Sequence, residues 1–320
     1  MNAAVKSESD TKTMCCASCG IAGGGDIILK KCDDCDLVKY CSDVCQRDHE
    51  AEHKKECKKR AAELHDEILF KQPESTHRGD CPICCLPLSI DVKKSTLMSC
   101  CSKYICDGCN LANQKREFEA RLQRKCPFCR KAMPETDEEF NKQLMKRVEA
   151  NDPFAMCFMG WKRCDEGDYK NAFEYCTRAA ALGDVEAHFH LSILYREGKG
   201  VDKDEKMELH HLIEAAISGH PMARHNLGCL EREKGRVDRA ATHWIIAAKL
   251  GDDRSLEAVK DLYKAGQVSK DDLATALRGH QAAVDATKSP QREAAVVYMK
   301  WLAGRAERGR GVGGSALTRS

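Results

Sequence analysis

The C-terminal half of the chain has a regular pattern of apolar and polar positions that is typical of packed helices. From about residue 152 the sequence is rich in alanine, and apolar residues recur at helical spacing. In residues 185–197, the positions that share one face are Ala187, Leu191, Leu194 and Tyr195. In the next predicted helix, the inward positions are Met207, Leu212, Ala215 and Ala216. The pattern therefore predicts pairs of helices that approach each other closely through small side chains.

This helical pattern is repeated along the chain. The similar segments RAAALGD, EAAISGH and IAAKLGD end at Asp184, His220 and Asp252. Their glycines, which are separated by 36 and 32 residues, are Gly183, Gly219 and Gly251. A period in the thirties with two helices per unit predicts an α-solenoid. We expect each of these glycines to end a helix in the left-handed conformation.

Further helices are predicted on both sides of the repeats. Thr136 with Glu139, and Ser269 with Asp272, have the spacing of capping boxes. They predict helices that start near residues 137 and 270.

Composition divides the chain chemically, because 17 of its 21 cysteines lie between Cys15 and Cys129. The first residues contain no apolar segment of a signal peptide, and no stretch approaches the roughly 20 apolar residues of a membrane span. We therefore expect an intracellular protein, cytoplasmic or nuclear, whose thiols stay reduced. Cysteines that occur as C-x-x-C pairs are then expected to bind zinc rather than to form disulfides.

The first cysteine-rich segment contains four pairs of zinc-ligand residues. They are Cys16/Cys19, Cys32/Cys35, Cys41/Cys45 and His53/Cys57. Eight ligands are enough for two tetrahedral zinc ions. The last two pairs are spaced by four residues, so we expect each of them to lie on one face of a helix. A segment of 42 residues cannot bury enough apolar surface to fold alone, so each zinc must supply about 10–16 kcal/mol of stability.

The order of these pairs, with YCSDVCQRDHEAEHKKEC, resembles the MYND-type zinc finger over residues 16–57. The resemblance implies interleaved sites, one of Cys16, Cys19, Cys41 and Cys45 and the other of Cys32, Cys35, His53 and Cys57. Cys15 is an alternative to Cys16, and His49 is an alternative to His53. Only His53 stands four residues before Cys57, so we expect His49 to lie beside the site.

MYND fingers bind short proline-containing peptides in a groove that includes a glutamine and a tryptophan. Gln46 occupies the glutamine position, whereas Glu50 stands where the family has tryptophan. The resemblance therefore implies a peptide groove without its usual apolar wall.

A second group of eight candidate ligands follows a polar linker at residues 71–80. Its members are Cys81, Cys84, Cys100, Cys101, Cys106, Cys109, Cys126 and Cys129. The segments CPIC and CPFCR resemble the two ends of a RING domain, a module in which two zinc sites interleave, over residues 81–133. The resemblance implies one zinc on Cys81, Cys84, Cys106 and Cys109, and another on Cys126, Cys129 and two residues of the middle segment.

The middle segment departs from the RING pattern. A typical RING has a histidine where this chain has Lys103 or Tyr104, and a protonated lysine is no zinc ligand. We expect that Cys100 and Cys101 both bind zinc. The alternative is that water replaces one of them, which would leave an open zinc. Cys85, next to a ligand, is expected to be a packed thiol.

RING ligases use no catalytic nucleophile, because they position a ubiquitin-charged conjugating enzyme. The resemblance implies that Ile83 and Pro127 dock this enzyme and that Arg130 clamps the ubiquitin. The alternative is that Ile83 and Pro127 only shape the zinc loops and that Arg130 is a solvated charge.

The repeat region resembles Sel-1-like repeats over residues 152–266, on its A-A-x-x-G endings and its GKGV turn. Members of that family are adaptor scaffolds that bind other proteins. The histidines at positions 188, 190, 210 and 211 are expected to be packed or surface residues rather than metal ligands, and the repeat cysteines to be small core residues. Two Arg-Gly steps near the C-terminus are a weak signal for RNA binding.

The sequence thus predicts a multidomain protein in which two small cross-braced zinc modules precede an all-α repeat solenoid. The expected segments are a disordered N-terminus (1–14), a MYND-type finger (15–57) whose helix continues to about residue 70, a linker (71–80), a RING-type finger (81–133), a connecting helix (134–151), Sel-1-like repeats (152–266), capping helices (267–303) and a disordered tail (304–320).

The predicted function is that of a zinc-binding, RING-type ubiquitin ligase that docks a conjugating enzyme and selects a protein substrate through its repeats. The alternative is a zinc-binding adaptor without catalysis. About four zinc ions per chain are expected. Fifteen thiolates add about fifteen negative charges and four zinc ions about eight positive ones, so the formal net charge of +2 becomes about −5. This charge argues against a nucleic-acid partner.

Overall fold

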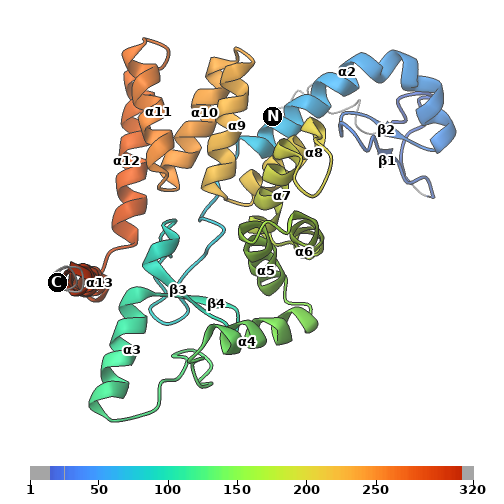
Figure 1. The fold of residues 1–320 in the computed structure, drawn as a ribbon. Coiled ribbons are helices and arrows are strands. Elements are labelled where there is room, and N and C mark those ends of the chain that lie inside the picture. Colours follow the sequence, from blue (N-terminus) through green and yellow to red (C-terminus); the bar gives the residue numbers. More distant parts are fainter. Residues whose placement is uncertain (1–14, 25, 312–320) are drawn as a thin grey trace, which may run out of the picture. The chain divides into compact units, whose positions relative to one another are not determined.

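The computed structural model describes residues 15–24 and 26–311, which form two compact units. The first unit ends at Lys71 and the second begins at Gln72 (Figure 1). The predicted disordered N-terminus lies outside the described residues, as do residues 312–320 of the predicted tail.

The first unit is built around cysteine rather than around apolar side chains. Two short antiparallel strands, β1 (Lys30–Lys31) and β2 (Lys39–Tyr40), precede the long helix α2 (Asp43–Leu69). Ser42 caps α2, because its hydroxyl accepts a hydrogen bond from the Cys45 amide. The buried cluster of this unit consists of Cys16, Cys32, Cys35 and Tyr40. A core of this kind depends on what the sulfur atoms bind.

The second unit begins with another small cysteine-rich module. The short helix η1 (Val92–Lys94) leads into β3 (Ser95–Met98), which pairs with β4 (Lys103–Cys106) in an antiparallel hairpin. Helix α3 (Asp107–Glu119) follows directly. Leu88, Met98 and Ile105 pack among the cysteines of this module.

The rest of the second unit is helical. The helices are α4 (Asp137–Glu149), α5 (Pro153–Asp165), α6 (Tyr169–Ala181), α7 (Val185–Glu197), α8 (Glu205–Ile217), α9 (Pro221–Glu233), α10 (Val237–Lys249), α11 (Asp253–Lys264), α12 (Lys270–Ala286) and α13 (Pro290–Gly311). Helix α5 packs on α6, α7 on α8, and α9 on α10, as expected for a solenoid of helix pairs (Figure 1).

Capping residues explain where most of these helices begin. The Thr136 hydroxyl accepts from the Glu139 amide at the start of α4, and Ser269 forms a full capping box with Asp272 at the start of α12. Both sequence-predicted starts are confirmed. Aspartate side chains cap α5, α6, α7, α8 and α11. Gly183, Gly219 and Gly251 have positive φ angles, as their place after a helix predicts.

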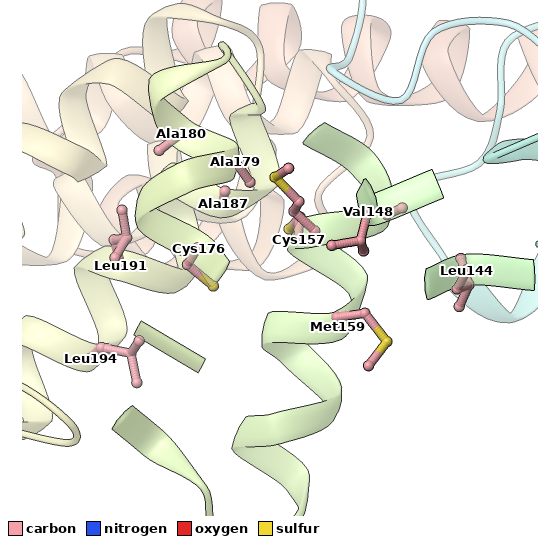
Figure 2. Packing of buried hydrophobic residues seen from close by; sticks show 12 residues of the cluster. Leu144, Val148, Cys157, Met159, Cys176, Ala179, Ala180, Ala187, Leu191 and Leu194 are labelled. Atoms are coloured by element: carbon pink, nitrogen blue, oxygen red, sulfur yellow. The ribbon is translucent and has the colours of Figure 1, made fainter. Parts of the chain in front are cut away.

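Small side chains form the centre of the repeat core, as Figure 2 shows. Ala179 and Ala187 are fully buried beside Leu191, and Cys157 and Cys176 are packed among them. These two thiols are core residues, as the sequence indicates. Gly160 is required here, since a Cβ atom at this position would lie 2.6 Å from the Cys176 Sγ.

The chain continues in helical form past the expected end of the capping helices. The break at Ser289 and Pro290 is present, but α13 extends to Gly311, whereas the sequence places the tail from residue 304. Among the described residues, no helix combines the length and the apolar character needed to cross a membrane.

The contact between Gly160 and Cys176 gives a test of this packing. Gly160→Ala should lower the free energy of unfolding by about 1–3 kcal/mol, because the added methyl overlaps a buried sulfur. The double variant Gly160→Ala/Cys176→Ala should recover part of this loss, since removing the sulfur makes room. Urea denaturation of the wild type, Gly160→Ala, Cys176→Ala and the double variant measures the coupling free energy between the two positions. Strictly additive effects would contradict the packing described.

Candidate metal centres

Among the residues that the structure describes, four groups of four side chains bring their ligand atoms together, each within 4.8 Å. The groups are Cys16/Cys19/Cys41/Cys45, Cys32/Cys35/His53/Cys57, Cys81/Cys84/Cys106/Cys109 and Cys100/Cys101/Cys126/Cys129. The structure thus brings together all sixteen sequence-predicted ligands, in the interleaved pairing that the resemblances imply. Zn–S bonds of about 2.3 Å in a tetrahedron place sulfurs about 3.8 Å apart. The observed Sγ–Sγ distances of 3.7 Å for Cys32 and Cys57, and 3.8 Å for Cys84 and Cys106, fit this geometry.

Each C-x-x-C pair at residues 16, 32, 81 and 126 lies on the same kind of backbone turn. The carbonyl of the first cysteine accepts a hydrogen bond from the amide four residues later. That fourth residue has a positive φ angle in all four turns, and these residues are Gly20, Asp36, Cys85 and Arg130. The turn directs both thiols of the pair to the same side. Cys85 and Arg130 therefore stand at equivalent positions where an L-residue is strained.

The two i, i+4 pairs differ from each other. His53 and Cys57 both lie on α2, and His53 Nε2 is 3.1 Å from the Cys35 Sγ. Cys41 precedes α2, although its Sγ is 3.5 Å from that of Cys45. The expectation that Cys41 and Cys45 share a helix face is therefore wrong. The sequence signal that marks the true start of the helix is the capping residue Ser42.

The thiols in these groups strongly oppose each other's ionisation. A hydrogen bond from the Cys106 thiol lowers the pKa of Cys81 to about 4, while the same contact raises the pKa of Cys106 far above its usual range. Burial raises the pKa of Cys109 to about 12. One thiolate therefore excludes others unless a cation offsets their charge. A divalent, sulfur-preferring ion that accepts four ligands meets this need, and the chain has about four such zinc sites.

The adjacent cysteines of the middle segment fit on the turn between β3 and β4. Cys100 Sγ lies 3.3 Å from Cys129 Sγ, and Cys101 Sγ lies 3.9 Å from Cys126 Sγ. Ser102, which follows them, has a positive φ of 54°. Lys103 is exposed on β4, away from any ligand role. Tyr104 packs its ring against Phe154 at 5.1 Å. The hairpin turn thus presents two successive thiols to one site.

The alternative ligands of the first unit lie beside the sites. Cys15 pairs with Ala22 in an isolated bridge, and it belongs to none of the four groups. His49 Nδ1 is 3.1 Å from the Tyr40 hydroxyl, and its ring stacks on that of His53 at 5.7 Å. His49 therefore supports the ligand His53.

A cavity of about 450 Å³ lies against α2 in the first unit. Its lining includes Gln46, Glu50 and Tyr40. The structure thus brings the glutamine of the peptide-groove pattern and the glutamate that replaces tryptophan into one cavity. Glu50 gives this cavity a charged side where the family pattern has an apolar one.

The candidate docking residues lie on two of the four turns. Ile83 is 42% exposed. Pro127 is half-buried, and Arg130 is exposed with a φ of 64°. Phe128, beside Pro127, is 45% exposed. Each turn therefore presents one large apolar side chain to solvent.

Arg292 of α13 contacts the second module, a contact that sequence reasoning missed. Its guanidinium donates to the Cys84 Sγ at 3.3 Å, to the Leu86 carbonyl at 3.0 Å and to the Pro87 carbonyl at 2.6 Å. Helix α13 packs on α3, where Gly108 leaves room for the Arg292 backbone. More than 200 residues separate Arg292 from Cys84. No local pattern indicates such a contact.

A fifth group, also missed, joins the linker to the repeats. Its members are His77, Glu186 and His220. His77 Nε2 lies 2.8 Å from Glu186 Oε2, and His220 Nε2 lies 3.4 Å from the same oxygen. The two imidazole rings are stacked, with centroids 4.3 Å apart and planes 12° apart. Parallel rings at this separation cannot both point their Nε2 lone pairs at one ion. We therefore interpret the group as a hydrogen-bonded latch.

The histidines of the repeats, which were expected to be packed or exposed, are so. His210 is exposed and His211 is buried. The rings of His188 and His211 contact each other, with their Nδ1 atoms 3.0 Å apart. His190 is half-buried and lies 3.7 Å from Glu186. None of these four residues belongs to a described metal group.

The metal content tests the ligand groups. Elemental analysis of purified protein should give about four zinc ions per chain. Cys100→Ser and Cys101→Ser should each lose about one ion, because each removes a ligand from the same site. Cys85→Gly is the matched control, since it relieves a left-handed residue next to a ligand and should keep the full content. Full zinc content in Cys101→Ser would contradict the assignment of adjacent ligands.

The latch gives the second unit a pH dependence. Burial lowers the pKa of His220 to about 4 from an ordinary value of 6.5. Between pH 4 and 6.5, His220 binds a proton in the unfolded chain but not in the folded one. Its contribution to the free energy of unfolding is therefore complete above pH 6.5 and falls as the pH drops toward 4. The loss from His220 is on the order of 3 kcal/mol.

His220→Asn keeps a side chain that can cap α9 but removes this titration. Urea unfolding between about pH 7 and 5, with zinc content checked at each step, should show a shallower pH dependence for His220→Asn. His210→Asn, at an exposed position on α8, should keep the original slope. Equal slopes in all three proteins would contradict the role of His220.

Comparisons with known proteins agree with this picture of the first unit. The family model for the MYND finger matches residues 16–57. A search of curated proteins finds no match.

Sixteen chains of solved structures match. A Sel1 repeat protein from Oxalobacter formigenes is 28% identical, with a TM-score of 0.41, over 48% of this chain and 66% of that one. A protective antigen present in uropathogenic Escherichia coli strains, displaying an SLR fold, is 24% identical, with a TM-score of 0.38, over 53% of this chain and 37% of that one. The matches span less than two thirds of either protein. Residues 16–57 are thus a MYND finger, and the helical part is similar to Sel1 repeat structures.

Proposed function

We propose that this protein is a RING-type ubiquitin ligase whose second zinc module docks a conjugating enzyme and whose repeats select a protein substrate. The observation that carries the proposal is the exposure of Ile83, on a zinc-site turn of a module with two interleaved tetrads. An apolar residue at this place within the first C-x-x-C pair is the docking residue of the RING pattern.

The proposal assigns the sixteen clustered residues as ligands of four zinc ions. It also assigns residues 81–133 to the RING-type module and residues 152–266 to the repeats. Zinc binding requires these thiols to stay reduced, which fits an intracellular protein. The metal ions hold the turns, and the turns hold Ile83, Pro127 and Arg130 at fixed places on the surface. Catalysis then consists of positioning, because the thioester of the conjugating enzyme and the substrate amine are the reacting groups.

Arg130 is suited to clamp ubiquitin for a conformational reason. Its backbone is held in the left-handed region by the hydrogen bond from its amide to the Cys126 carbonyl, which has a length of 2.9 Å. The side chain of an exposed arginine at a fixed backbone position can donate several hydrogen bonds to carbonyl groups of a partner. The fixed backbone and the exposed guanidinium of Arg130 support the clamp role that the sequence resemblance implies.

Contacts around the second module support a division of labour between it and the repeats. The latch joins the linker residue His77 to Glu186 on α7 and to His220 at the start of α9, and Arg292 joins the module to α13. A substrate bound on the repeats would thus lie in the same compact unit as a docked conjugating enzyme. Proximity of this kind is the main rate effect available to a ligase without a nucleophile.

The second candidate function is that of an adaptor without catalysis. The observation in its favour is Glu50, which lines the cavity of the MYND finger where an apolar wall would hold a proline. In this case the zinc modules and repeats provide binding surfaces alone. Discharge of ubiquitin from a charged conjugating enzyme distinguishes the two functions, since an adaptor has no effect on it.

The ligase function is tested with a panel of ubiquitin-charged conjugating enzymes and the zinc-loaded protein. We expect faster discharge onto free lysine, and a loss of about tenfold or more in Ile83→Ala and in Arg130→Gly. Glycine at position 130 removes the side chain without strain.

Matched controls come from the same module. Arg121 is also an exposed arginine with a positive φ, and Val92 is an exposed apolar residue on η1. Arg121→Gly and Val92→Ala should therefore keep full activity. Absence of discharge with every enzyme of the panel, or equal loss in the controls, would contradict the ligase function.

A further inference from the structure

A cavity of about 720 Å³ lies on the surface of the repeats, far along the chain from the zinc ligands. Helix α9 contributes His225, Cys229 and Arg232 to its lining, and α10 contributes Trp244. Helix α11 adds Arg254 and other charged residues. The cavity therefore combines a thiol, an imidazole and charges of both signs.

Cys229 and His225 form a thiol–imidazole pair within this cavity. They are spaced by four residues on α9, and Cys229 Sγ lies 3.6 Å from His225 Nε2. Both residues are partly buried and line the cavity. A nucleophile within hydrogen-bond reach of a base is the arrangement that activates a thiol.

Two buried residues fix the tautomer of His225. The Ser255 hydroxyl donates to Asp252 Oδ2 at 2.7 Å, so its own proton is in use. Its oxygen lies 2.8 Å from His225 Nδ1, and this contact requires Nδ1 to be the donor. The unprotonated nitrogen is then Nε2, which faces the thiol. Ser255 and Asp252 are almost fully buried, so this orientation is held by the core.

The position of His225 is fixed from the other side as well. Trp244 Nε1 donates to the His225 carbonyl at 3.1 Å. Gly228 allows this approach, because a Cβ atom there would lie 2.4 Å from Trp244 Nε1. The helix turn that carries the pair is therefore packed tightly against α10.

The resting pair is neutral. Burial raises the pKa of the Cys229 thiol, and the nearby Glu233 carboxylate adds to this effect. Burial lowers the pKa of His225. The thiol thus stays protonated until His225 accepts its proton during attack, which is general-base catalysis.

Charged groups around the thiol indicate the class of ligand. The guanidinium of Arg232 lies over the Trp244 ring at 5.7 Å, and Arg254 donates to Asp252 Oδ1 at 3.3 Å. Glu233, Glu257 and Asp261 lie on the same lining. The two guanidinium groups suit carboxylates of a ligand, while the three carboxylates suit its ammonium groups. The lining therefore fits a small molecule that carries charges of both signs.

We propose that Cys229 is a site of thiol–disulfide exchange with small disulfides that carry both ammonium and carboxylate groups, and we use glutathione disulfide as the probe. The Cys229 sulfur attacks one sulfur of the disulfide while its proton moves to His225 Nε2. A new S–S bond forms as the old one breaks, and the leaving thiolate takes the proton back from His225. The products are a mixed disulfide on Cys229 and one free thiol, so electrons and atoms balance.

The experiment incubates the full-length, zinc-loaded protein with glutathione disulfide and follows each cysteine by peptide mass mapping. We expect Cys229 to be modified about tenfold or more faster than Cys164, a half-buried thiol on α5 that lies near Lys199 and Glu197. His225→Gln should reduce the Cys229 rate to that of Cys164. Similar rates for the two thiols in the wild-type protein, or an unchanged rate in His225→Gln, would overturn the proposal.

Two further measurements distinguish a specific loss of reactivity from a loss of folding. Circular dichroism of each variant must match the wild type. Ser255→Ala, which no longer fixes the tautomer of His225, should slow the modification of Cys229 while leaving that of Cys164 unchanged.

A third variant tests the class of ligand. Arg232→Ala should slow the reaction of Cys229 with glutathione disulfide but leave its reaction with the neutral bis(2-hydroxyethyl) disulfide unchanged. Equal slowing of both disulfides would overturn the zwitterionic ligand class.

Discussion

The fold of both cysteine-rich modules depends on one constraint, which is that four thiol or imidazole ligands must share a single cation. In the first unit the buried cluster is three cysteines and Tyr40, and in the second module Leu88, Met98 and Ile105 are the main apolar additions. Thiols this close oppose each other's ionisation, because the contact that lowers the pKa of Cys81 raises that of Cys106. Without a metal ion, the clustered thiols of the core either repel each other as thiolates or stay protonated. Zinc coordination thus provides the folding free energy that apolar burial provides in the repeats.

The same constraint fixes the surface on which the proposed function depends. Each C-x-x-C turn closes through the hydrogen bond to the first cysteine carbonyl, and the residue at its end takes a left-handed conformation. Ile83 and Arg130 lie on two such turns, so their positions follow from the metal ligands beside them. The latch of Glu186 with His77 joins the preceding linker to the repeats, and the contacts of Arg292 join this module to α13. Within the second unit, metal binding is therefore linked to the positions of Ile83 and Arg130 and to the contacts between the module and the helices.

The sequence predicts what is local and fails on what is distant. Ligand spacing marked the sixteen candidate ligands, whereas their grouping into tetrads came from the resemblances to MYND and RING modules, and the four groups match it. Capping residues such as Thr136 and Ser269 located helix starts. The wrong expectation for Cys41 arose because spacing alone ignored the cap at Ser42. Three sets of contacts join separate elements: those of Arg292, those of the latch on Glu186, and the series of hydrogen bonds that runs from Asp252 to Cys229. Such contacts depend on the tertiary packing of the helices and leave no periodic signal.

Amide hydrogen exchange with and without a zinc chelator tests the central claim most directly. The account predicts that residues 15–57 and 81–133 lose their protection when zinc is removed, while residues 152–266 keep theirs, because only the modules use metal as their core. Retention of protection in either cysteine-rich module after complete removal of zinc would contradict it.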